Sequence, residues 1–456
     1  MEIVDSGQAE FVVVYGRRRV GKTYLVRETF AGELTFSYTG VANVTAKVQL
    51  AQFVRALREH GHQPEPVNDW FDAFAQLRVF LEHRRDGNPL VVFLDELPWM
   101  DSRKSGFLPA FEHFWNGWAA QVKELTLIAC GSATSWVTKK VLRDTGGLYN
   151  RVTQQIHLRP FTLAECRELF DAKGIVWNLH DMVEAYMVFG GIPYYLNLLA
   201  RGRSLAQSVD ELCFAEDARL AGEFSQFFDA LFTDPERHRD IVRVLARKKS
   251  GLTRTEIAQT VGFPDGGNLT RLLRELEESD FVRSYRPFGK AKAGAIWQLT
   301  DQFTAFYLTF MEDRVPGRMW ASFLDNAQHR AWSGYAFEGV CLAHLPQIRR
   351  ALGISGVLQD ASSWRGRGDP GAQVDLVIDR SDNVINLCEM KYASGPFEVD
   401  KAIDGVLRER AAAFRAQTRT TKAVHLTLVT TYGLKPGRYA SVFSSQVTMD
   451  DLFAPA

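Results

Sequence analysis

Two segments of this sequence carry residue types that bind phosphate groups, and the first spans residues 16–23. It reads Gly-Arg-Arg-Arg-Val-Gly-Lys-Thr and follows the β-branched run 11–15. Glycines let a loop close around phosphate oxygens, Lys22 supplies a cation for the β- and γ-phosphates, and Thr23 offers its hydroxyl to Mg²⁺. The spacing predicts a phosphate-binding loop between a buried strand and a helix over 23–30, whose first N–H groups point at the same anion.

The second segment is an apolar run that ends in two carboxylates, Pro-Leu-Val-Val-Phe-Leu-Asp-Glu over residues 89–96. Acidic residues also cap ordinary strands, but this pair follows a phosphate-binding loop in the order of the Walker A and B motifs. We expect Asp95 to hold the hydration shell of Mg²⁺ and Glu96 to polarise the attacking water. Together the two segments predict a site for ATP and Mg²⁺.

Two more apolar runs predict further strands of the same sheet. Residues 125–132 read Leu-Thr-Leu-Ile-Ala-Cys-Gly-Ser and end in small polar residues. Ser132 or Thr134 at this strand end is a candidate sensor of the γ-phosphate, and the alternative is that Ser132 caps the next helix. The run 34–38 adds a strand and is expected to keep the Walker A and B strands from being neighbours.

Composition limits the class of protein. The 456 residues are more than a single hydrophobic core supports, so two to four domains of about 100–200 residues are expected. Basic and acidic residues both number 54, so the net charge is zero and does not attract the protein to nucleic acid or anionic lipid. The chain starts without a secretion signal and has no apolar run of about 18 residues, which favours the cytoplasm. The cysteines form no C-x-x-C pair and are expected to be buried thiols: Cys130, Cys166, Cys213, Cys341 and Cys388.

The middle of the chain alternates between helical and strand patterns. Apolar residues recur at helical spacing from 162 to about 232, as in a helical lid over a nucleotide. Residues 252–263 and 268–278 predict two helices around a Gly-containing turn, and 281–285 and 295–299 predict strands, which gives a winged helix. Its second helix carries two arginines among several acidic residues. DNA recognition and an interdomain role both stay open, and the acidic excess favours the interdomain role.

A second group of acidic residues lies near the carboxyl end. The runs 373–379 and 384–391 alternate in the strand period, so Glu389 and Lys391 project from one face and Asp375 is expected on the neighbouring strand. Two carboxylates on a hard cation, with a lysine that orients water, suffice for metal-assisted phosphodiester hydrolysis. We therefore expect Asp375 and Glu389 to be metal ligands.

A basic stripe follows these strands. Arg408, Arg415, Arg419 and Lys422 share one side of a predicted helix, opposite its apolar side. This stripe either tracks a phosphate backbone or is an ordinary solvated face.

These motifs together resemble the archaeal-type ATPases of the AAA+/STAND group. The resemblance rests on the loop 16–23, on Leu-Asp-Glu-Leu-Pro-Trp, on Cys-Gly-Ser, on Gly-Leu-Tyr-Asn-Arg before Leu-Arg-Pro-Phe, and on Gly-Gly-Ile-Pro-Tyr-Tyr-Leu. It implies that Arg151 lies near the phosphates as an arginine finger or sensor, and that Pro193 of the lid approaches the adenine. Only ten residues precede the first strand, fewer than in most members.

The C-terminal pattern resembles the PD-(D/E)XK nuclease fold, a domain that commonly follows these ATPases. This resemblance implies that Glu338, on the first helix, joins the acidic site. Whether such a domain cleaves nucleic acid or only binds it stays open.

The sequence thus predicts an α/β protein with a parallel P-loop ATPase sheet, a helical lid, a winged helix and a C-terminal α/β nuclease-like domain. It is expected to bind and hydrolyse ATP with Mg²⁺ and to couple nucleotide state to nucleic-acid binding or metal-dependent cleavage of DNA or RNA. The alternative is a STAND-type signalling switch that forms homo-oligomers or binds a protein partner. A membrane-associated role is not supported, because the sequence shows no anchoring segment.

The predicted domains are 1–160, 161–235, 236–315 and 325–456, with a linker around 314–326. The predicted catalytic residues are Glu96, Arg151, Glu338, Asp375, Glu389 and Lys391. The predicted nucleotide-binding residues are Gly16, Arg17, Arg18, Arg19, Val20, Gly21, Lys22, Thr23, Asp95, Ser132 and Pro193.

Overall fold

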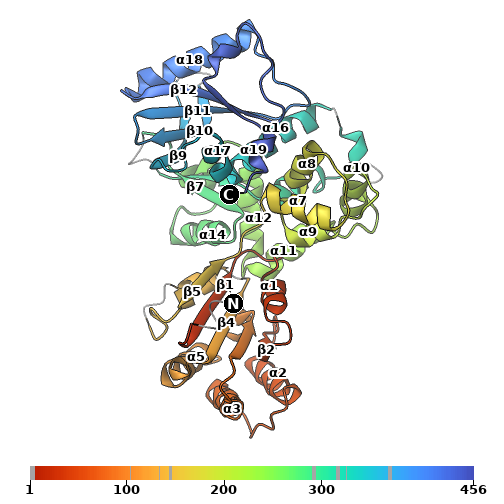
Figure 1. Ribbon diagram of the computed structural model, residues 1–456, viewed down its shortest axis with the longest axis vertical. Helices are drawn as coiled ribbons and strands as arrows, with labels where there is room; N and C mark the ends of the chain where they lie inside the picture. Colours follow the sequence, from red (N-terminus) through yellow and green to blue (C-terminus); the bar gives the residue numbers. More distant parts are fainter. Residues whose placement is uncertain are drawn as a thin grey trace. The chain divides into compact units, whose positions relative to one another are not determined.

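The structure is a computed structural model, and its chain divides into two compact units between residues 159 and 160. Figure 1 labels the elements of each unit, which are treated separately below. The described residues are 6–102, 104–132, 134–142, 146–289, 294–314, 319–324, 326–367 and 372–455.

The first unit contains a five-stranded parallel sheet in the order β2-β3-β4-β1-β5. The predicted α/β class and the non-neighbouring Walker strands are confirmed, because β4 lies between β1 and β3. The run 34–38 was expected to separate them, but it forms the edge strand β2. The strands are β1 (Glu10–Tyr15), β2 (Leu34–Thr39), β3 (Leu90–Asp95), β4 (Leu125–Gly131) and β5 (Gln154–His157).

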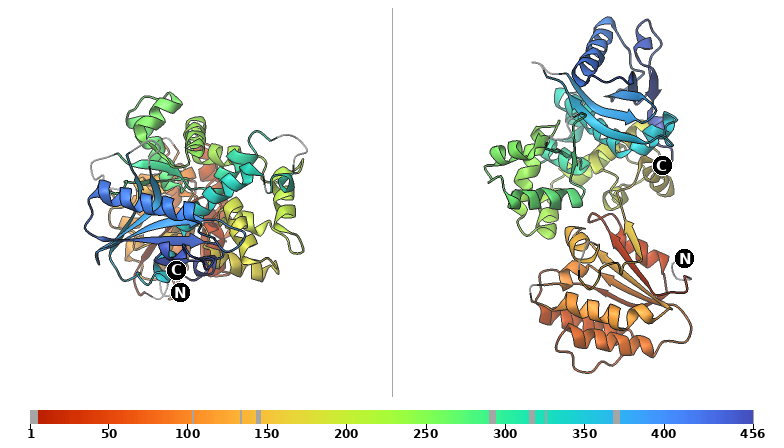
Figure 2. Two further views of the ribbon diagram at one scale, coloured as in Figure 1. Left: turned by 90° about the horizontal axis from the view of Figure 1, so that it is seen from above. Right: turned by 90° about the vertical axis from the view of Figure 1, so that its left-hand side faces the viewer.

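Helices cover both faces of this sheet, so its strands are buried on two sides (Figure 2). Phe11 and Val13 of β1 pack against α2, α3 and α5, whereas Val12 and Val14 face Val26 of α1. This two-sided burial explains why the strands are continuous apolar runs in the sequence. The helices are α1 (Lys22–Thr29), α2 (Ala46–Glu59), α3 (Trp70–Glu82), α4 (Leu97–Met100), α5 (Phe107–Gly117), η1 (Ala119–Gln121), α6 (Thr134–Val137) and η2 (Thr138–Leu142).

The second unit begins with helices that pack on its own C-terminal part. The His344 imidazole Nε2 accepts a hydrogen bond from the Leu163 amide at 2.9 Å, at the start of α7. The ring of His180 in α8 stacks on Tyr392 and Tyr432, with centroids 4.8 and 5.6 Å away. The helices predicted as a lid therefore belong to this unit. They are α7 (Leu163–Ala172), α8 (Leu179–Phe189), α9 (Pro193–Asn197), α10 (Leu205–Val209), η3 (Asp210–Phe214) and α11 (Glu223–Leu231).

A small antiparallel sheet with three helices follows, in the strand order β6-β8-β7. The helices and strands predicted between residues 252 and 299 are present. The predicted linker also contributes to packing, because Trp320 is buried against Phe306, Phe310 and Trp332. The elements are α12 (Pro235–Arg247), β6 (Leu252–Thr253), α13 (Arg254–Val261), α14 (Gly267–Glu278), β7 (Val282–Tyr285), β8 (Ile296–Leu299), α15 (Gln302–Phe310) and η4 (Trp320–Ser322).

The last part of the chain is a mixed sheet in the order β13-β12-β11-β10-β9. Strands β9 to β11 are antiparallel, and β11 to β13 are parallel. Figure 2 shows α18 along one face, where Leu407, Ala411 and Phe414 pack on the strands. The elements are α16 (Ala327–Ala343), α17 (Leu345–Ala351), β9 (Gln359–Arg365), β10 (Gln373–Arg380), β11 (Val384–Lys391), α18 (Lys401–Thr418), β12 (Ala423–Thr430), η5 (Ala440–Val442), β13 (Ser445–Val447) and α19 (Met449–Leu452).

Two expectations from composition concern the whole described chain. All five cysteines are buried free thiols, as expected. Across the described residues, no helix combines the length and apolar character needed to cross a bilayer.

Candidate functional site

The phosphate-binding loop links the carboxyl end of β1 to the first turn of α1. Gly16 has a φ of 143°, and a Cβ there would lie 2.2 Å from the Leu158 carbonyl oxygen, so only glycine fits. Gly21 has a φ of 91° and precedes α1. Because glycine has no side chain to cap the helix, the first N–H groups of α1 remain suited to an anion. Arg19 also takes a left-handed conformation, with a φ of 71°. Arg17 and Val20 are buried, whereas Arg18 and Arg19 are half-buried.

Lys22 lies inside this loop rather than on its surface. Its Nζ donates hydrogen bonds to the carbonyl oxygens of Gly16 and Arg17, both at 3.0 Å. The side chain is 5% exposed. Burial lowers the pKa of Lys22, and the nearby charges of Asp95 and Glu96 oppose that shift. The ammonium is thus held at the centre of the loop, where phosphate oxygens are expected.

Thr23 and Asp95 meet across the sheet, although 72 residues separate them in sequence. The Thr23 hydroxyl donates to Asp95 Oδ2 at 2.8 Å, and the Glu96 amide donates to Asp95 Oδ1 at 3.0 Å. A hydroxyl and a carboxylate are hard oxygen donors, which Mg²⁺ prefers. These two predicted metal ligands are therefore brought together.

Glu96 is fixed by Ser132 at the end of β4. Glu96 Oε2 accepts hydrogen bonds from the Ser132 amide at 3.1 Å and from its hydroxyl at 2.8 Å. The backbone of Glu96 is left-handed, with a φ of 53°, which is uncommon outside glycine. Burial raises the pKa of Glu96, and the bonds from Ser132 oppose that shift. Ser132 thus positions Glu96, a role not predicted from the sequence. The side chain of Thr134 lies outside the described part.

Gln49 on α2 connects this site to the loop after β2, and no motif pointed to it. Its Nε2 donates to the carbonyl oxygens of Val41 at 2.6 Å and Trp99 at 2.7 Å. Its Oε1 accepts from the Tyr38 hydroxyl at 2.7 Å and from the Val41 amide at 3.1 Å. Gly40 lies beside it, where a Cβ would be 2.7 Å from the Glu96 carbonyl oxygen. This fully buried amide holds the segment that follows Glu96.

Arg151 does not join these residues within the first unit. β5 runs parallel to β1, with Val12 beside Gln154 and Tyr15 beside His157. Arg151 precedes β5 and so lies at the amino-terminal edge of the sheet, whereas the loop follows the carboxyl end of β1. Within its own unit Arg151 thus lies away from the loop, and its role as an arginine finger or sensor stays a prediction. Pro193 begins α9 in the second unit, so its approach to the adenine stays a prediction.

The four residues predicted for the C-terminal site line one cavity of about 620 Å³ in the second unit. Leu376 pairs with Cys388, so Asp375 and Glu389 come next on the two adjacent strands. The cavity is lined by Glu338 of α16, by Asp375 and Gln373 of β10, by Glu389, Met390 and Lys391 of β11, by Arg367 and Ala372, and by Val406, Glu409, Arg410, Ala413 and Gln417 of α18.

The carboxylates in this cavity have different electrostatic surroundings. Burial raises the pKa of Glu338 to about 8, and the charges of Asp375 and Glu389 add to the shift. Glu389 Oε1 pairs with Lys391 Nζ at 2.9 Å, while Oε2 pairs with the guanidinium of Arg410. Among the described residues, no group of three or more His, Cys, Asp or Glu side chains is arranged to hold a metal ion.

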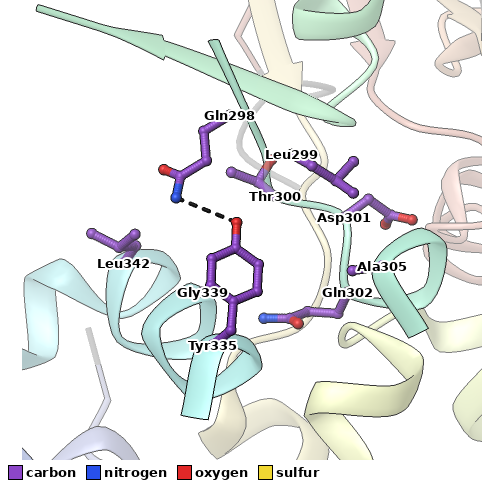
Figure 3. A pocket seen from close by; sticks show the side chains of 9 residues that line it. All are labelled: Gln298, Leu299, Thr300, Asp301, Gln302, Ala305, Tyr335, Gly339 and Leu342. Atoms are coloured by element: carbon purple, nitrogen blue, oxygen red, sulfur yellow. Dashed lines mark hydrogen bonds between the residues drawn. The ribbon is translucent and has the colours of Figure 1, made fainter. Parts of the chain in front are cut away.

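The small antiparallel sheet packs against the helix that carries Glu338. Figure 3 shows Gln298 of β8 pointing at Tyr335 of α16, with a hydrogen bond of 3.4 Å. The pocket beside them measures about 20 Å³, room for roughly one water molecule. Arg283 of β7 donates to Gln298 at 2.9 and 2.7 Å. Burial lowers the pKa of Arg283, and the charges of Asp375 and Glu338 oppose that shift. Arg283 therefore lies within electrostatic range of Asp375 and Glu338, while its hydrogen bonds go to Gln298.

The predicted basic stripe on α18 is largely engaged by neighbouring groups. Arg408 pairs with Asp404 at 2.9 Å, and Arg415 donates to the Val424 carbonyl at 3.0 Å. Lys422 pairs with Asp379 at 2.6 Å. None of the stripe residues lines the cavity, whereas Arg410 does. The cation of α18 that faces the acidic residues is therefore Arg410, which the helical pattern did not single out.

Comparison with known proteins supports the interpretation of the first site. Residues 1–199 match the model of a family described as an ATPase domain predominantly from Archaea. The uncharacterized protein MJECL04 of Methanocaldococcus jannaschii is 24% identical over 399 residues, which cover 86% of this chain and 84% of that protein.

Two solved structures are similar to part of this chain. The Walker-type ATPase PABY2304 of Pyrococcus abyssi is 16% identical, with 66% of this chain and 91% of that chain covered and a TM-score of 0.49. The ORC2 protein of Aeropyrum pernix, in ADPNP and ADP complexes, is 15% identical, with 67% and 88% covered and a TM-score of 0.40. The family match and the loop geometry, rather than these structures, support a P-loop nucleotide-binding ATPase domain in the first part of the chain.

Proposed function

We propose that the P-loop ATPase domain binds Mg-ATP at residues 16–23 and hydrolyses it. The observation that carries this proposal is the 2.8 Å hydrogen bond between Thr23 and Asp95, beside the buried Lys22. Thr23 and Asp95 are the residues that would hold Mg²⁺, which when bound would neutralise charge on the phosphate oxygens. Lys22 binds the β- and γ-phosphates. Glu96, held by Ser132, orients and polarises the attacking water.

Steady-state turnover of purified full-length protein tests this proposal. Asp95→Asn is expected to lower ATP hydrolysis by about a hundredfold and to weaken its dependence on Mg²⁺, because the metal loses a charged partner. Asp101→Asn is the matched control, since Asp101 follows the same strand but its carboxylate accepts a hydrogen bond from Trp136 Nε1 instead. Equal turnover by Asp95→Asn and wild type would contradict the assignment.

A second proposed role for Arg151 requires a second copy of the chain. Its place at the far edge of the sheet supports action as an arginine finger only toward the phosphates of a neighbouring subunit. Complementation tests this: mixing inactive Lys22→Ala with inactive Arg151→Ala is expected to restore part of the turnover. Mixtures that stay as inactive as their components would remove the homo-oligomer from the proposal.

We infer that the second unit acts on nucleic acid through the cavity around Glu338. The convergence of Glu338, Asp375, Glu389 and Lys391 from three elements supports a nuclease-like domain. Its carboxylates suit Mg²⁺ or Mn²⁺ once Glu389 is released from its ion pairs. Metal-dependent nicking by wild type that disappears in Glu389→Ala is the expected result. Identical DNA and RNA ladders from the two proteins would leave binding alone as the role of this domain.

The small sheet with α12 to α14 is proposed to be a winged helix with an interdomain role. On α14, Arg271 pairs with Glu275 at 2.8 Å, which supports a face that does not bind phosphate.

The competing function of the whole protein is a nucleotide-dependent signalling switch. Tight nucleotide retention without turnover, together with ATP-dependent oligomerisation in light scattering, would favour the signalling switch.

The five buried thiols are consistent with the proposed cytoplasmic location.

A further inference from the structure

Strand β9 is an edge strand of the mixed sheet, and part of its outer side is unpaired. In the described part of the chain β9 pairs with β10 on one side and with no strand on the other. The Ser363 carbonyl oxygen points outward, because it accepts a hydrogen bond from the Phe288 amide at 2.7 Å. Hydrogen-bonding groups alternate along a strand, so the amides and carbonyls of Gln359 and Ala361 point the same way. Such an edge is a template for an added strand.

A surface pocket of about 950 Å³ adjoins this edge and is lined by α17, by the loop before β9 and by Gln359. Arg349 and Arg350, in the last turn of α17, line the pocket, and none of its described lining residues is acidic. The Nε of Arg349 is buried and has no hydrogen-bond partner in the described structure. Arg350 donates to the Pro455 carbonyl oxygen at 2.9 Å. The pocket therefore offers two guanidinium groups to a carboxylate.

The other groups at this surface favour a peptide as the source of that carboxylate. Gln359 Nε2 donates to the Ile354 carbonyl oxygen at 3.0 Å, whereas its Oε1 is buried without a partner and can accept from an incoming N–H. Leu358, which also lines the pocket, is 81% exposed and can contact an apolar side chain. A peptide supplies N–H groups, apolar side chains and carboxylates together. A phosphate backbone has no N–H to donate and gains little from Leu358.

We propose that the outer edge of β9 and the pocket beside it bind an extended, acidic segment of a partner protein. The segment adds a strand to the mixed sheet by hydrogen bonding to Gln359 and Ala361, and one of its carboxylates contacts Arg349 and Arg350. The pocket shares no lining residue with the acidic cavity around Glu338. The inference therefore goes beyond the proposed functions of the two sites and does not depend on either.

The test measures binding of a fluorescein-labelled peptide to full-length protein by fluorescence anisotropy. The peptide has about six residues, the usual length of a strand, and its glutamates alternate with valine or threonine. One matched peptide carries lysine in place of glutamate, and another keeps the glutamates but has proline at its centre. Each is expected to bind at least about tenfold more weakly, because the first loses its charge-assisted contacts and the second cannot complete the strand ladder.

Variants of the protein test each half of the surface. Arg349→Gln is expected to weaken binding of the acidic peptide about tenfold, the order of one charge-assisted hydrogen bond. Arg438→Gln is the matched control, an exposed change in the same unit outside the pocket, and should bind as wild type does. Ala361→Pro removes an outward amide and should also weaken binding, and thermal unfolding checks that the second unit stays folded.

Hydrogen exchange in wild type tests the added strand directly. The amides of residues 359–361 should exchange more slowly when the acidic peptide is bound, because the outward ones then donate to its carbonyls. A contact made by side chains alone would leave their exchange unchanged.

Three results would overturn the proposal. In the first, Arg349→Gln binds the acidic peptide as tightly as Arg438→Gln, or the proline peptide binds as tightly as its parent. In the second, a single-stranded oligodeoxynucleotide displaces the peptide and itself loses affinity in Arg349→Gln, so the surface binds phosphate instead. In the third, light scattering shows wild-type dimers that Ala361→Pro separates, so a second copy of the chain occupies the edge.

Discussion

The two sites contain the same kinds of side chain, carboxylates near a lysine, but they hold them differently. In the first unit, Asp95 accepts a hydrogen bond from the neutral Thr23, and Lys22 donates to main-chain carbonyls. In the second unit, Glu389 is bound by the charged Lys391 and Arg410. Neutral partners are exchanged for an incoming ligand more easily than charged ones. The carboxylate of the first site is thus held by a neutral partner, whereas Glu389 of the second site is held by two cations.

The two sites also differ in the groups that surround a buried glutamate. Burial raises the pKa of both Glu96 and Glu338. Glu96 has two donors from Ser132 that favour its charged form, while Glu338 faces the like charges of Asp375 and Glu389. The hydrogen bonds from Ser132 thus oppose the raised pKa of Glu96, whereas Glu338, with a pKa of about 8, keeps its proton near neutral pH.

The largest expected effect comes from removing Lys22. Lys22→Ala is expected to lower ATP turnover by about a thousandfold or more, because the ammonium that the loop carbonyls hold at its centre is lost. Phosphate release measures this. Arg27→Ala, an exposed change on the same helix, should leave turnover nearly unchanged. Substantial turnover by Lys22→Ala would mean that the loop is not the hydrolytic site.

Glu96→Gln should separate hydrolysis from binding in the first unit. Turnover is expected to fall about a hundredfold, since the amide cannot polarise water, while the affinity for a fluorescent ATP analogue changes little. Glu338→Gln in the second unit should not change turnover at all. The comparison of the two sites fails if both glutamines slow hydrolysis to the same extent.

Gln49→Ala tests whether the buried amide positions Glu96 rather than only stabilising the fold. We expect kcat to fall about tenfold with KM for ATP nearly unchanged, because the Trp99 and Val41 carbonyls lose their donor and the segment after Glu96 shifts. Lys47→Ala on the same helix is the control. Gln49→Glu keeps the acceptor oxygen and should be intermediate. A rise in KM without loss of kcat would assign Gln49 to binding instead.

Local residue patterns were enough to predict most of the strands and the nucleotide loop. The glycines at 16 and 21 and the carboxylates that end β3 are constrained by chemistry, so sequence alone identified them. The two-residue period of strands predicted that Glu389 and Lys391 share one face, and the next apolar run suggested that Asp375 lies on the neighbouring strand. In each case the determining residues lie within one element or two consecutive ones.

The remaining errors concern contacts between distant elements. Gln49 belongs to no motif, and its role depends on the packing of α2 against the segment after β3. Arg410 lies 21 residues after Glu389 and meets it only because α18 crosses the sheet face. Arg151 was assigned by resemblance, but its position depends on the direction of β5 beside β1. Strand order and helix crossing are tertiary properties that residue spacing does not encode.

The smallest expected effect is a pH-dependent change in stability at Glu338. Its pKa is raised from 4.5 to about 8, so between these values the folded protein holds a proton that the unfolded chain has lost. The free energy of unfolding should therefore fall as pH rises from 4.5 to about 8 and then level off. Glu338→Gln stays neutral and should be more stable than wild type by about 4 kcal/mol at pH 9 but similar at pH 5. Urea unfolding followed by tryptophan fluorescence measures this, since Trp320 and Trp332 are buried in the second unit. Glu409→Gln, an exposed change in the same cavity, is the control and should keep the pH dependence of wild type. If the stability of Glu338→Gln changes with pH in the same way as that of wild type, Glu338 is ionised in the folded state and the prediction is wrong.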